Sequence, residues 1–399
     1  MTPAGNSSLL TPVDDACTRK EMEGPIVDQA TEHQHHEPAR VETLELGIDT
    51  FGDVTADADG VALSDAQVIR NVIAEGVLAD QVGIDFFGLG EHHRADFAVS
   101  APETVLAAIA GRTERIRLGS AVTVLSSDDP IRVFQRFATL DAASNGRAEV
   151  ILGRGSFTES FPLFGFDLGD YERLFEEKLD LFVELLDERP VTWSGTTRPA
   201  LHDQSVYPRT ESGRLTTWVG VGGSPQSVVR AAHHRLPLML AIIGGEPARF
   251  APFVDLYHRA LREFGAPTLP VGVHSPGHLA ATDTEAREQL WPHWQVMRNR
   301  IGAERGWGPT SRAEFDHAAG PSGALYVGSP ETVARKIVAT VGTLGVSRFD
   351  MKYSAGQLPH ELLMNSIELY GTRVIPLVRD MLAEQSDPTG RPDLEFVAG

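Results

Sequence analysis

The chain has 399 residues, of which 42% are hydrophobic and 23% are charged, a composition ordinary for a soluble globular protein. Its formal net charge of −20 argues against nucleic acid or an anionic membrane surface as the main partner, because both attract basic patches. No apolar run reaches the roughly 18 residues that suggest a membrane span, and no secretory signal pattern opens the chain. The single cysteine, Cys17, excludes an internal disulfide, so we expect a cytoplasmic protein.

Both ends of the chain are expected to be unstructured. Residues 1–40 show no apolar period and are rich in polar and acidic side chains. His33, His35 and His36 fall in this tail; a metal site is the alternative, but a solvated tail is the better interpretation. We expect one folded domain over residues 41–385 and a second short tail over residues 386–399.

Between these tails, short apolar strands alternate with amphipathic helices. Strand 1 is predicted at 44–51, after which Ser64 caps a helix, with Gln67 three residues later as in a capping box. Strands 2 to 4 are predicted at 83–90, 115–125 and 148–155, with helices from 102, at 130–144 and at 171–186. Residues 190–215 are predicted to form turns and short strands. Strands 5 to 8 are predicted at 217–223, 236–243, 269–275 and 347–353, with helices at 224–234, 248–264, 331–344 and 358–378.

This alternation predicts a closed (β/α)₈ TIM barrel. Continuous apolar strands are typical of parallel sheets that are buried on both faces, and eight strand–helix units favour a barrel over an open sheet. The connections after strands 4 and 7 are long, which makes them candidate lids or substrate walls. Because barrel chemistry lies at the C-terminal strand ends, the polar residues there are the candidates for a site.

Two strand ends form a candidate anion site. Strand 5 ends in "GVGGSPQS", where Gly223 lets the backbone approach a ligand and Ser224 suits the N-cap of a helix, three residues before Ser227. Such a helix start offers free N–H groups to a phosphate. Arg154, at the end of strand 4, suits a bidentate phosphate contact. The alternative is a well-capped helix beside a structural arginine. No complete G-x-G-x-x-G fingerprint is present, and the similar "GSPETV" at 328–333 is interpreted as structural.

Strand 2 ends in Glu91-His92-His93, which raises the question of a metal site. Neighbouring strand residues point to opposite faces, so His92 and His93 are not expected to converge on one ion, and we predict no metal. The zincin pattern of two helical histidines is also absent. One histidine entering the barrel mouth as an acid/base group is the more plausible function, and a histidine satisfied by its neighbours is the alternative.

The assembled segments resemble the bacterial luciferase-like flavin monooxygenases. The resemblance extends from about Leu44 to Val378, and the order and spacing of the segments make it specific. The segments are "FGLGEHH", "IRLGSAVTVLSSDDPIRVFQRFATLDAASNGR" (116–147), "LGRG", "WVGVGGSPQSVVRAAHHRLPLML" (218–240) and "YVGSPETVARKI" (326–337). The resemblance implies a TIM barrel that binds FMN at its mouth, uses reduced flavin and O₂ to oxidise a small organic substrate, and obtains the reduced flavin from a separate reductase. It also implies a homodimer.

The resemblance assigns roles residue by residue. His92 matches the family's active-site histidine, which is proposed to act in acid/base chemistry. Ala121 and Val122 match the pair that lies against the flavin ring, where a non-proline cis peptide is often found. Arg154, with Gly155 and the backbone of Ser156, matches one half of the phosphate site. Gly223, Ser224 and Ser227 match the other half.

The sequence departs from luciferase at several positions. Gly153 stands where luciferase has a reactive cysteine, Gly223 stands where the family has a glutamate, and "SSDDPIR" lacks a histidine before the proline. We therefore expect a monooxygenase or oxidoreductase that does not emit light. Two alternatives remain open: an F420-dependent hydride-transfer enzyme and a flavin-binding protein without turnover. Phe51, Phe157 and Tyr353 are candidate pocket residues, for which a place in the buried core is the preferred interpretation.

Overall fold

A computed structural model describes residues 44–57 and 59–386 of the chain. The predicted N-terminal tail (1–40), with Cys17 and its three histidines, lies outside the described residues. Residues 387–399 of the predicted C-terminal tail also lie outside them. Within the described part, no helix is both long and apolar enough to cross a membrane.

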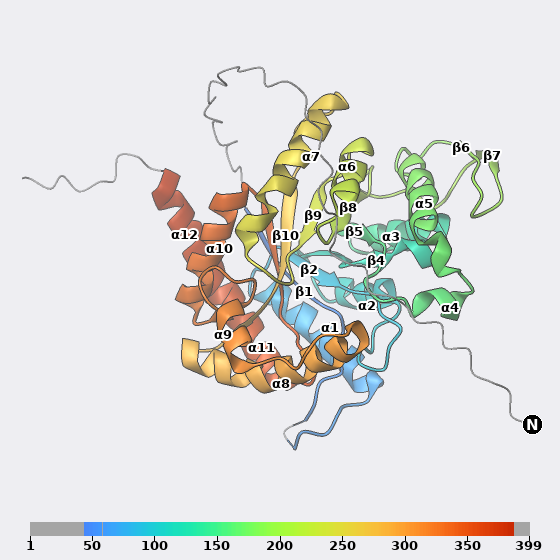
Figure 1. Ribbon diagram of the computed structural model, residues 1–399. Helices are drawn as coiled ribbons and strands as arrows, with labels where there is room; N and C mark the ends of the chain where they lie inside the picture. The colour runs from blue at the N-terminus through green and yellow to red at the C-terminus, as the bar shows by residue number, and fades with distance from the viewer. Residues whose placement is uncertain (1–43, 58, 387–399) are drawn as a thin grey trace, which may run out of the picture. The chain divides into compact units, whose positions relative to one another are not determined.

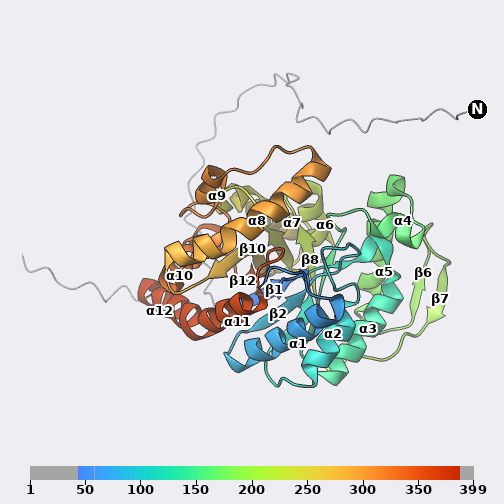
Figure 2. The same ribbon diagram turned by 90° about the horizontal axis from the view of Figure 1, so that it is seen from below.

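The described residues form a closed, parallel, eight-stranded barrel, which confirms the predicted fold. Its strands are β1 (Glu45–Thr50), β2 (Phe86–Leu89), β3 (Arg117–Ser120) with β4 (Thr123–Val124), β5 (Ala148–Gly153), β8 (Thr216–Val221), β9 (Leu238–Ala241), β10 (Val271–Leu279) and β12 (Arg348–Lys352). Parallel pairing of β12 with β1, and of β9 with β10, completes the ring. Viewed along the strands, the helices surround this central sheet (Figure 2).

The helices form the outer layer of the barrel (Figure 1). They are α1 (Asp65–Gln81), α2 (Pro102–Ala110), α3 (Pro130–Ala143), α5 (Tyr171–Leu185), α6 (Pro225–His233), α7 (Ala251–Glu263), α10 (Pro330–Leu344), α11 (His360–Leu369) and α12 (Ile375–Ser386). Ser64 caps α1 as predicted, but Gln67 bonds to Asn71 and Arg70, so the reciprocal half of the capping box is absent. The single helix predicted at 358–378 is instead α11, a π-helical turn at 370–374, and α12, which extends to Ser386.

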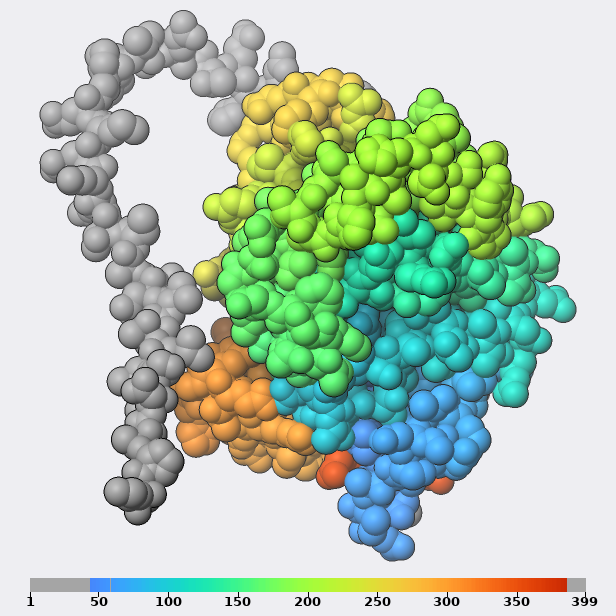
Figure 3. Space-filling view, turned by 90° about the vertical axis from the view of Figure 1, so that its right-hand side faces the viewer, coloured from blue at the N-terminus to red at the C-terminus, as the bar shows by residue number. Residues whose placement is uncertain are grey.

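The two long connections carry extra elements. The chain after β5 forms α4 (Ser160–Phe164), and a hairpin of β6 (Val191–Trp193) and β7 (Leu201–Gln204) follows α5. The chain after β10 forms α8 (Asp283–Arg305), α9 (Arg312–Ala318) and β11 (Tyr326–Gly328). These connections touch, because Arg305 donates to the carbonyl of Ser156 at 3.2 Å. In the space-filling view, the green and orange segments therefore lie on the same side of the molecule (Figure 3).

A buried ionic cluster lies in the barrel interior. Arg348 is fully buried; it donates to Glu149 at 2.7 Å and to Asp350 at 3.0 Å. Its guanidinium lies 3.6 Å from the ring centroid of Phe86. Burial raises the pKa of Asp350 to about 6, although the Arg348 charge opposes this shift. Charges this deep in a core require partners, so the cluster is a main determinant of how the barrel interior packs.

Candidate active site

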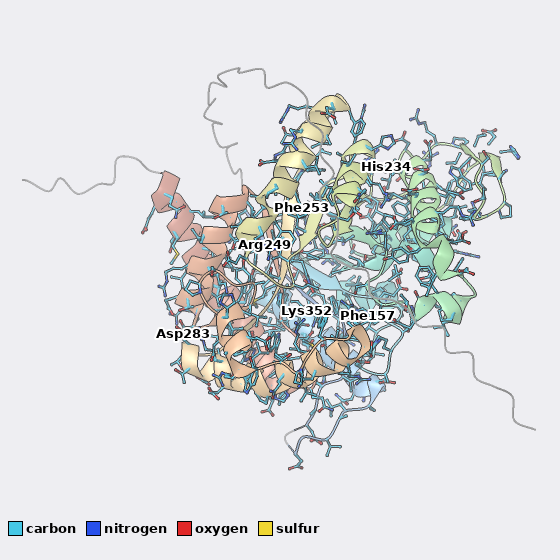
Figure 4. The ribbon with its side chains drawn as sticks, in the orientation of Figure 1. Phe157, His234, Arg249, Phe253, Asp283 and Lys352 are labelled. Carbon is cyan, nitrogen blue, oxygen red and sulfur yellow. The ribbon has the colours of Figure 1, made fainter. Side chains whose placement is uncertain are left out.

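A cavity of about 330 Å³ lies at the C-terminal ends of the barrel strands. Its volume is within the range of small-molecule sites. All eight strand positions of the barrel contribute to its wall, from Asp49 of β1 round to Asp350 of β12. Figure 4 labels Lys352 near the centre of the ribbon and Phe157 on the side of α4. The cavity therefore occupies the place where barrel enzymes carry their chemistry.

The structure brings most of the predicted site residues together around this cavity. The predicted residues that line it are His92, Ala121, Val122, Arg154, Gly155, Ser156 and Ser227. Gly223 and Ser224 do not line it directly, but they form the turn that leads into α6. Gly223 has φ +113°, a backbone region that favours glycine, and Ser224 is the N-cap of α6.

The Ala121–Val122 peptide is cis, as the family resemblance implies. It lies between β3 and β4 and faces the cavity. A Cβ atom added at Gly153 would lie 2.5 Å from Cγ2 of Val122. A cysteine at this position, as in luciferase, would therefore force Val122 to move. The glycine leaves room for the Val122 side chain in the cavity wall.

His92 lies among aromatic rings at the mouth of the cavity. Its ring packs against Phe97 at 4.3 Å and against Phe51 and Phe157 at 4.9 and 5.2 Å. Nδ1 of His92 lies 3.9 Å from Oε1 of Glu159. Burial alone would raise the pKa of Glu159, but the neighbouring His92 ring and other contacts lower it. An ionised Glu159 is therefore placed to stabilise a protonated His92.

The expectation that only one of the two histidines enters the barrel mouth is wrong. His93 lines the cavity together with His92, because residues 90–93 lie beyond the end of β2 and do not follow strand alternation. Nε2 of His93 lies 2.9 Å from Oε1 of Glu91, whose other oxygen accepts from the backbone N–H of Val124 at 2.9 Å. Glu91 therefore fixes both His93 and β4. Within residues 44–57 and 59–386, no group of three or more His, Cys, Asp or Glu side chains is arranged to hold a metal ion.

The predicted anion site corresponds to the part of the cavity wall between β5 and the start of α6. Ser224 Oγ accepts from the Ser227 N–H at 3.4 Å, while the Oγ atom of Ser227 is buried without a hydrogen-bond partner. Arg154 contacts the carboxylate of Glu172, and its guanidinium lies 5.3 Å from the ring centroid of Tyr171. The Tyr171 hydroxyl donates to the carbonyl of Gly155 at 2.7 Å, which ties α5 to the loop that carries Arg154.

Glu172 and Arg230 are site neighbours that the sequence did not predict. The Glu172 carboxylate bridges Arg154 and Arg230, the latter at 3.1 Å. Only 10% of the Arg230 side chain is exposed, and its Nη1 atom is buried without a partner. Glu172 is 58% exposed and can turn toward solvent at little cost. The Glu172 carboxylate therefore links the two arginines, and Arg230 also pairs with Glu176 at 2.7 Å.

The two aromatic pocket candidates Phe51 and Phe157 line the cavity, so the preferred core interpretation is wrong for both. It is right for Tyr353, which is fully buried and donates to Oε2 of Glu75 at 2.6 Å. His274 and Asp49 also line the cavity and were missed. Their hydrogen bond joins two distant strands, and nothing in either strand's sequence signals it.

Sequence comparison places these features among known proteins. The model of the luciferase-like monooxygenase family matches residues 50–348. The uncharacterized protein y4vJ of Sinorhizobium fredii is 34% identical over 143 residues, which are 36% of this chain and 41% of that protein. The alkanal monooxygenase alpha chain of Photorhabdus luminescens is 24% identical over 264 residues, covering 63% of this chain and 68% of the relative.

Solved structures with the same fold include three related barrels. Monooxygenase RslO1 from Streptomyces bottropensis superposes with a TM-score of 0.73 at 24% identity, over 84% of this chain and 99% of RslO1. The oxygenating constituent of 3,6-diketocamphane monooxygenase from Pseudomonas putida, in complex with FMN, has a TM-score of 0.67 at 19% identity. The superposition covers 84% of this chain and 98% of that protein. An F420-dependent secondary alcohol dehydrogenase has a TM-score of 0.66 at 17% identity, and the superposition covers 85% of this chain and 100% of the dehydrogenase. With the family model matching most of the barrel, the chain belongs to the luciferase-like monooxygenase family.

Proposed function

We propose that the protein is an FMN-dependent monooxygenase that uses reduced flavin and O₂ to oxidise a small organic substrate. The observation that carries the proposal is a single cavity with His92 at its mouth and an anion site, formed by Arg154 and the start of α6, at its edge. Reduced flavin, when bound, supplies the electrons for the reaction with O₂. The proposal includes a cytoplasmic homodimer and a separate reductase that supplies the reduced flavin.

The residues of the predicted anion site fit a phosphate group. The Arg154 guanidinium can donate two parallel hydrogen bonds to phosphate oxygens. The start of α6 adds free N–H groups and the positive end of the helix dipole. The buried Ser227 Oγ, which has no partner, is one more donor for a phosphate oxygen. The Ala121–Val122 wall is apolar, as the contact surface of a flat aromatic ring requires.

The chain's own side chains have distinct tasks in this proposal. The cofactor is bound and oriented by Arg154, Gly155, Ser156, Gly223, Ser224 and Ser227. His92 takes up or releases a proton at the cavity mouth, with Glu159 stabilising its charged form. The rings of Phe51 and Phe157 exclude water around His92.

The F420 alternative uses the same barrel and has a structural relative in the F420-dependent dehydrogenase. We favour FMN because the family that matches residues 50–348 is described as monooxygenases, and because the segments at strands 3 and 4 are nearer to luciferase. We disfavour a flavin-binding protein without turnover because the His92–Glu159 pair at the cavity mouth suits proton transfer, which flavin binding alone does not require.

The test is a titration of the purified full chain with FMN, and in parallel with F420, followed by flavin fluorescence. We expect FMN to bind at micromolar concentration and more tightly than F420. With reduced FMN, O₂ and a substrate found by screening, His92→Gln is expected to lower turnover by roughly 100- to 10,000-fold, the usual contribution of an acid/base group. Tight F420 binding with negligible FMN binding would overturn the choice of cofactor, and unchanged turnover in His92→Gln would remove its catalytic role.

Replacing Glu172 with glutamine is expected to raise FMN affinity by about two- to fivefold, because a partly exposed carboxylate that competes for two arginines contributes only modestly. Riboflavin, which lacks the phosphate, is expected to bind equally to both proteins. Glu176→Gln is the matched control, since Glu176 contacts Arg230 at 2.7 Å but not Arg154. A loss of FMN affinity in Glu172→Gln would mean that Glu172 orients Arg154 for the phosphate and does not compete with it.

A further inference from the structure

The floor of the cavity holds a second polar centre, distant in sequence from His92. Nδ1 of His274 on β10 lies 2.7 Å from Oδ2 of Asp49 on β1. His274 is 8% exposed and Asp49 is fully buried, yet both line the cavity. Strand β12 separates β10 from β1 in the barrel, so this hydrogen bond crosses the interior between strands that are not neighbours.

The hydrogen bond determines which nitrogen faces a ligand. Nδ1 shares its proton with Asp49, and Nε2 makes no hydrogen bond with any residue of the described chain. The other oxygen of Asp49, Oδ1, is buried without a partner. A carboxylate in this position holds the imidazole in one tautomer and stabilises the imidazolium that forms when Nε2 gains a proton. Burial alone would lower the pKa of His274, but the charge and hydrogen bond of Asp49 raise it.

The surroundings of His274 restrict the class of ligand. The ring of Phe51 is nearly parallel to His274, at 6.0 Å and 12°, and separates it from His92. Ile151 and Met239 add apolar wall. The charged groups that face His274 are Asp49 from β1 and Asp350 and Lys352 from β12. The two carboxylates outnumber the one ammonium and disfavour a ligand that arrives as an anion. A ligand with an apolar ring and one acidic hydroxyl arrives neutral and meets both an apolar wall and a hydrogen-bond acceptor, and an oxyanion formed there is paired with the imidazolium that takes its proton.

We infer that His274, positioned by Asp49, binds the hydroxyl of a phenol or enol substrate and accepts its proton at Nε2. The O–H bond of the substrate breaks and an N–H bond forms at Nε2. The substrate oxygen keeps the electron pair as an oxyanion, and the imidazolium is paired with Asp49. The step needs no oxidant. It rests on the proposed function, because it names the substrate class of the same cavity and adds a catalytic residue beside His92.

The test uses 2-naphthol and naphthalene as probes, because they share a ring system and differ by one hydroxyl. Their binding to the full chain is measured with and without saturating FMN. The wild-type protein is expected to prefer 2-naphthol by about tenfold, and bound 2-naphthol is expected to absorb as naphtholate. His274→Leu is expected to bring the preference below about twofold, since one hydrogen bond to a charged pair is lost. His274→Gln is expected to keep part of the preference and to lose the naphtholate absorption.

His360→Leu is the matched control. Nδ1 of His360 lies 2.8 Å from Oε1 of Glu75, a pair of the same kind that does not line the cavity. This variant is expected to behave as wild type toward both probes. The inference is overturned if 2-naphthol and naphthalene bind equally to the wild type, if neither binds, or if the preference survives in His274→Leu. FMN affinity and thermal unfolding are measured on every variant, so a failure of FMN binding in the wild type counts against the proposed function alone.

Discussion

Replacing Arg154 with leucine is expected to weaken FMN binding by roughly 10- to 100-fold while riboflavin affinity stays the same. A hydrogen bond to a charged group contributes about 1.5–3 kcal/mol, and Arg154 is the one arginine among the described residues that line the cavity. The phosphate is the only part of FMN that riboflavin lacks, so the ratio of the two affinities isolates the contact. Fluorescence titration of both flavins against the same protein measures it.

Arg173→Leu is the control for this prediction. Arg173 lies in the first turn of α5, is 53% exposed, and pairs with Asp170 at 2.7 Å. Its removal changes the net charge by the same amount as the Arg154 substitution but leaves the cavity intact. If Arg173→Leu weakens FMN binding as much as Arg154→Leu does, the loss of affinity comes from the change in net charge and not from a direct contact with the phosphate. If Arg154→Leu weakens both flavins equally, the phosphate lies elsewhere.

The barrel was predictable because its local signals are strong and agree with one another. Ser64 and Ser224 stand as N-caps before amphipathic helices, and the structure begins helices directly after both. The apolar strands lie within one to three residues of their predicted bounds for most of the barrel. The exception is β10, which extends to Leu279 because its second half pairs with β11. That pairing lies in the long connection, where the sequence has no regular period.

The candidate site was predictable only where one segment carries the whole signal. One such segment is Arg154 followed by Gly155, and the other is Ser224 followed by α6; both lie at strand ends. The alternation rule misplaces His93 because β2 ends at Leu89, before the histidines. His274 was missed because it lies inside an apolar strand, and its partner Asp49 is far away in sequence. Glu172 was missed because a glutamate in the first turn of α5 is also what an ordinary helix prefers.

The largest effect on stability is expected at Arg348. Arg348→Ala would leave the buried Asp350 without its partner and would leave the buried Glu149 with Arg117 as its remaining cation, and breaking a buried pair costs about 3–5 kcal/mol. Urea unfolding measures the free energy. Arg312→Ala is the control, because Arg312 makes its ion pairs with Glu288 and Asp316 on the surface, where such pairs contribute about 0–1 kcal/mol. A cost in Arg348→Ala no larger than in the control would contradict the prediction.

The pH dependence distinguishes stranded charge from lost packing. Burial already raises the pKa of Asp350 to about 6, above its value in the unfolded chain. A group with a raised folded pKa stabilises the fold fully below its unfolded pKa and loses that contribution as pH rises through the folded one. The Arg348 charge lowers the pKa of Asp350, so without Arg348 that pKa rises further, and the deficit of Arg348→Ala is expected to be smaller at pH 6 than at pH 8. Arg348→Met combined with Glu149→Gln and Asp350→Asn removes the charges and is expected to recover much of the loss. A deficit that is equal at both pH values and persists in the triple variant would instead assign the role of Arg348 to its packing against Phe86.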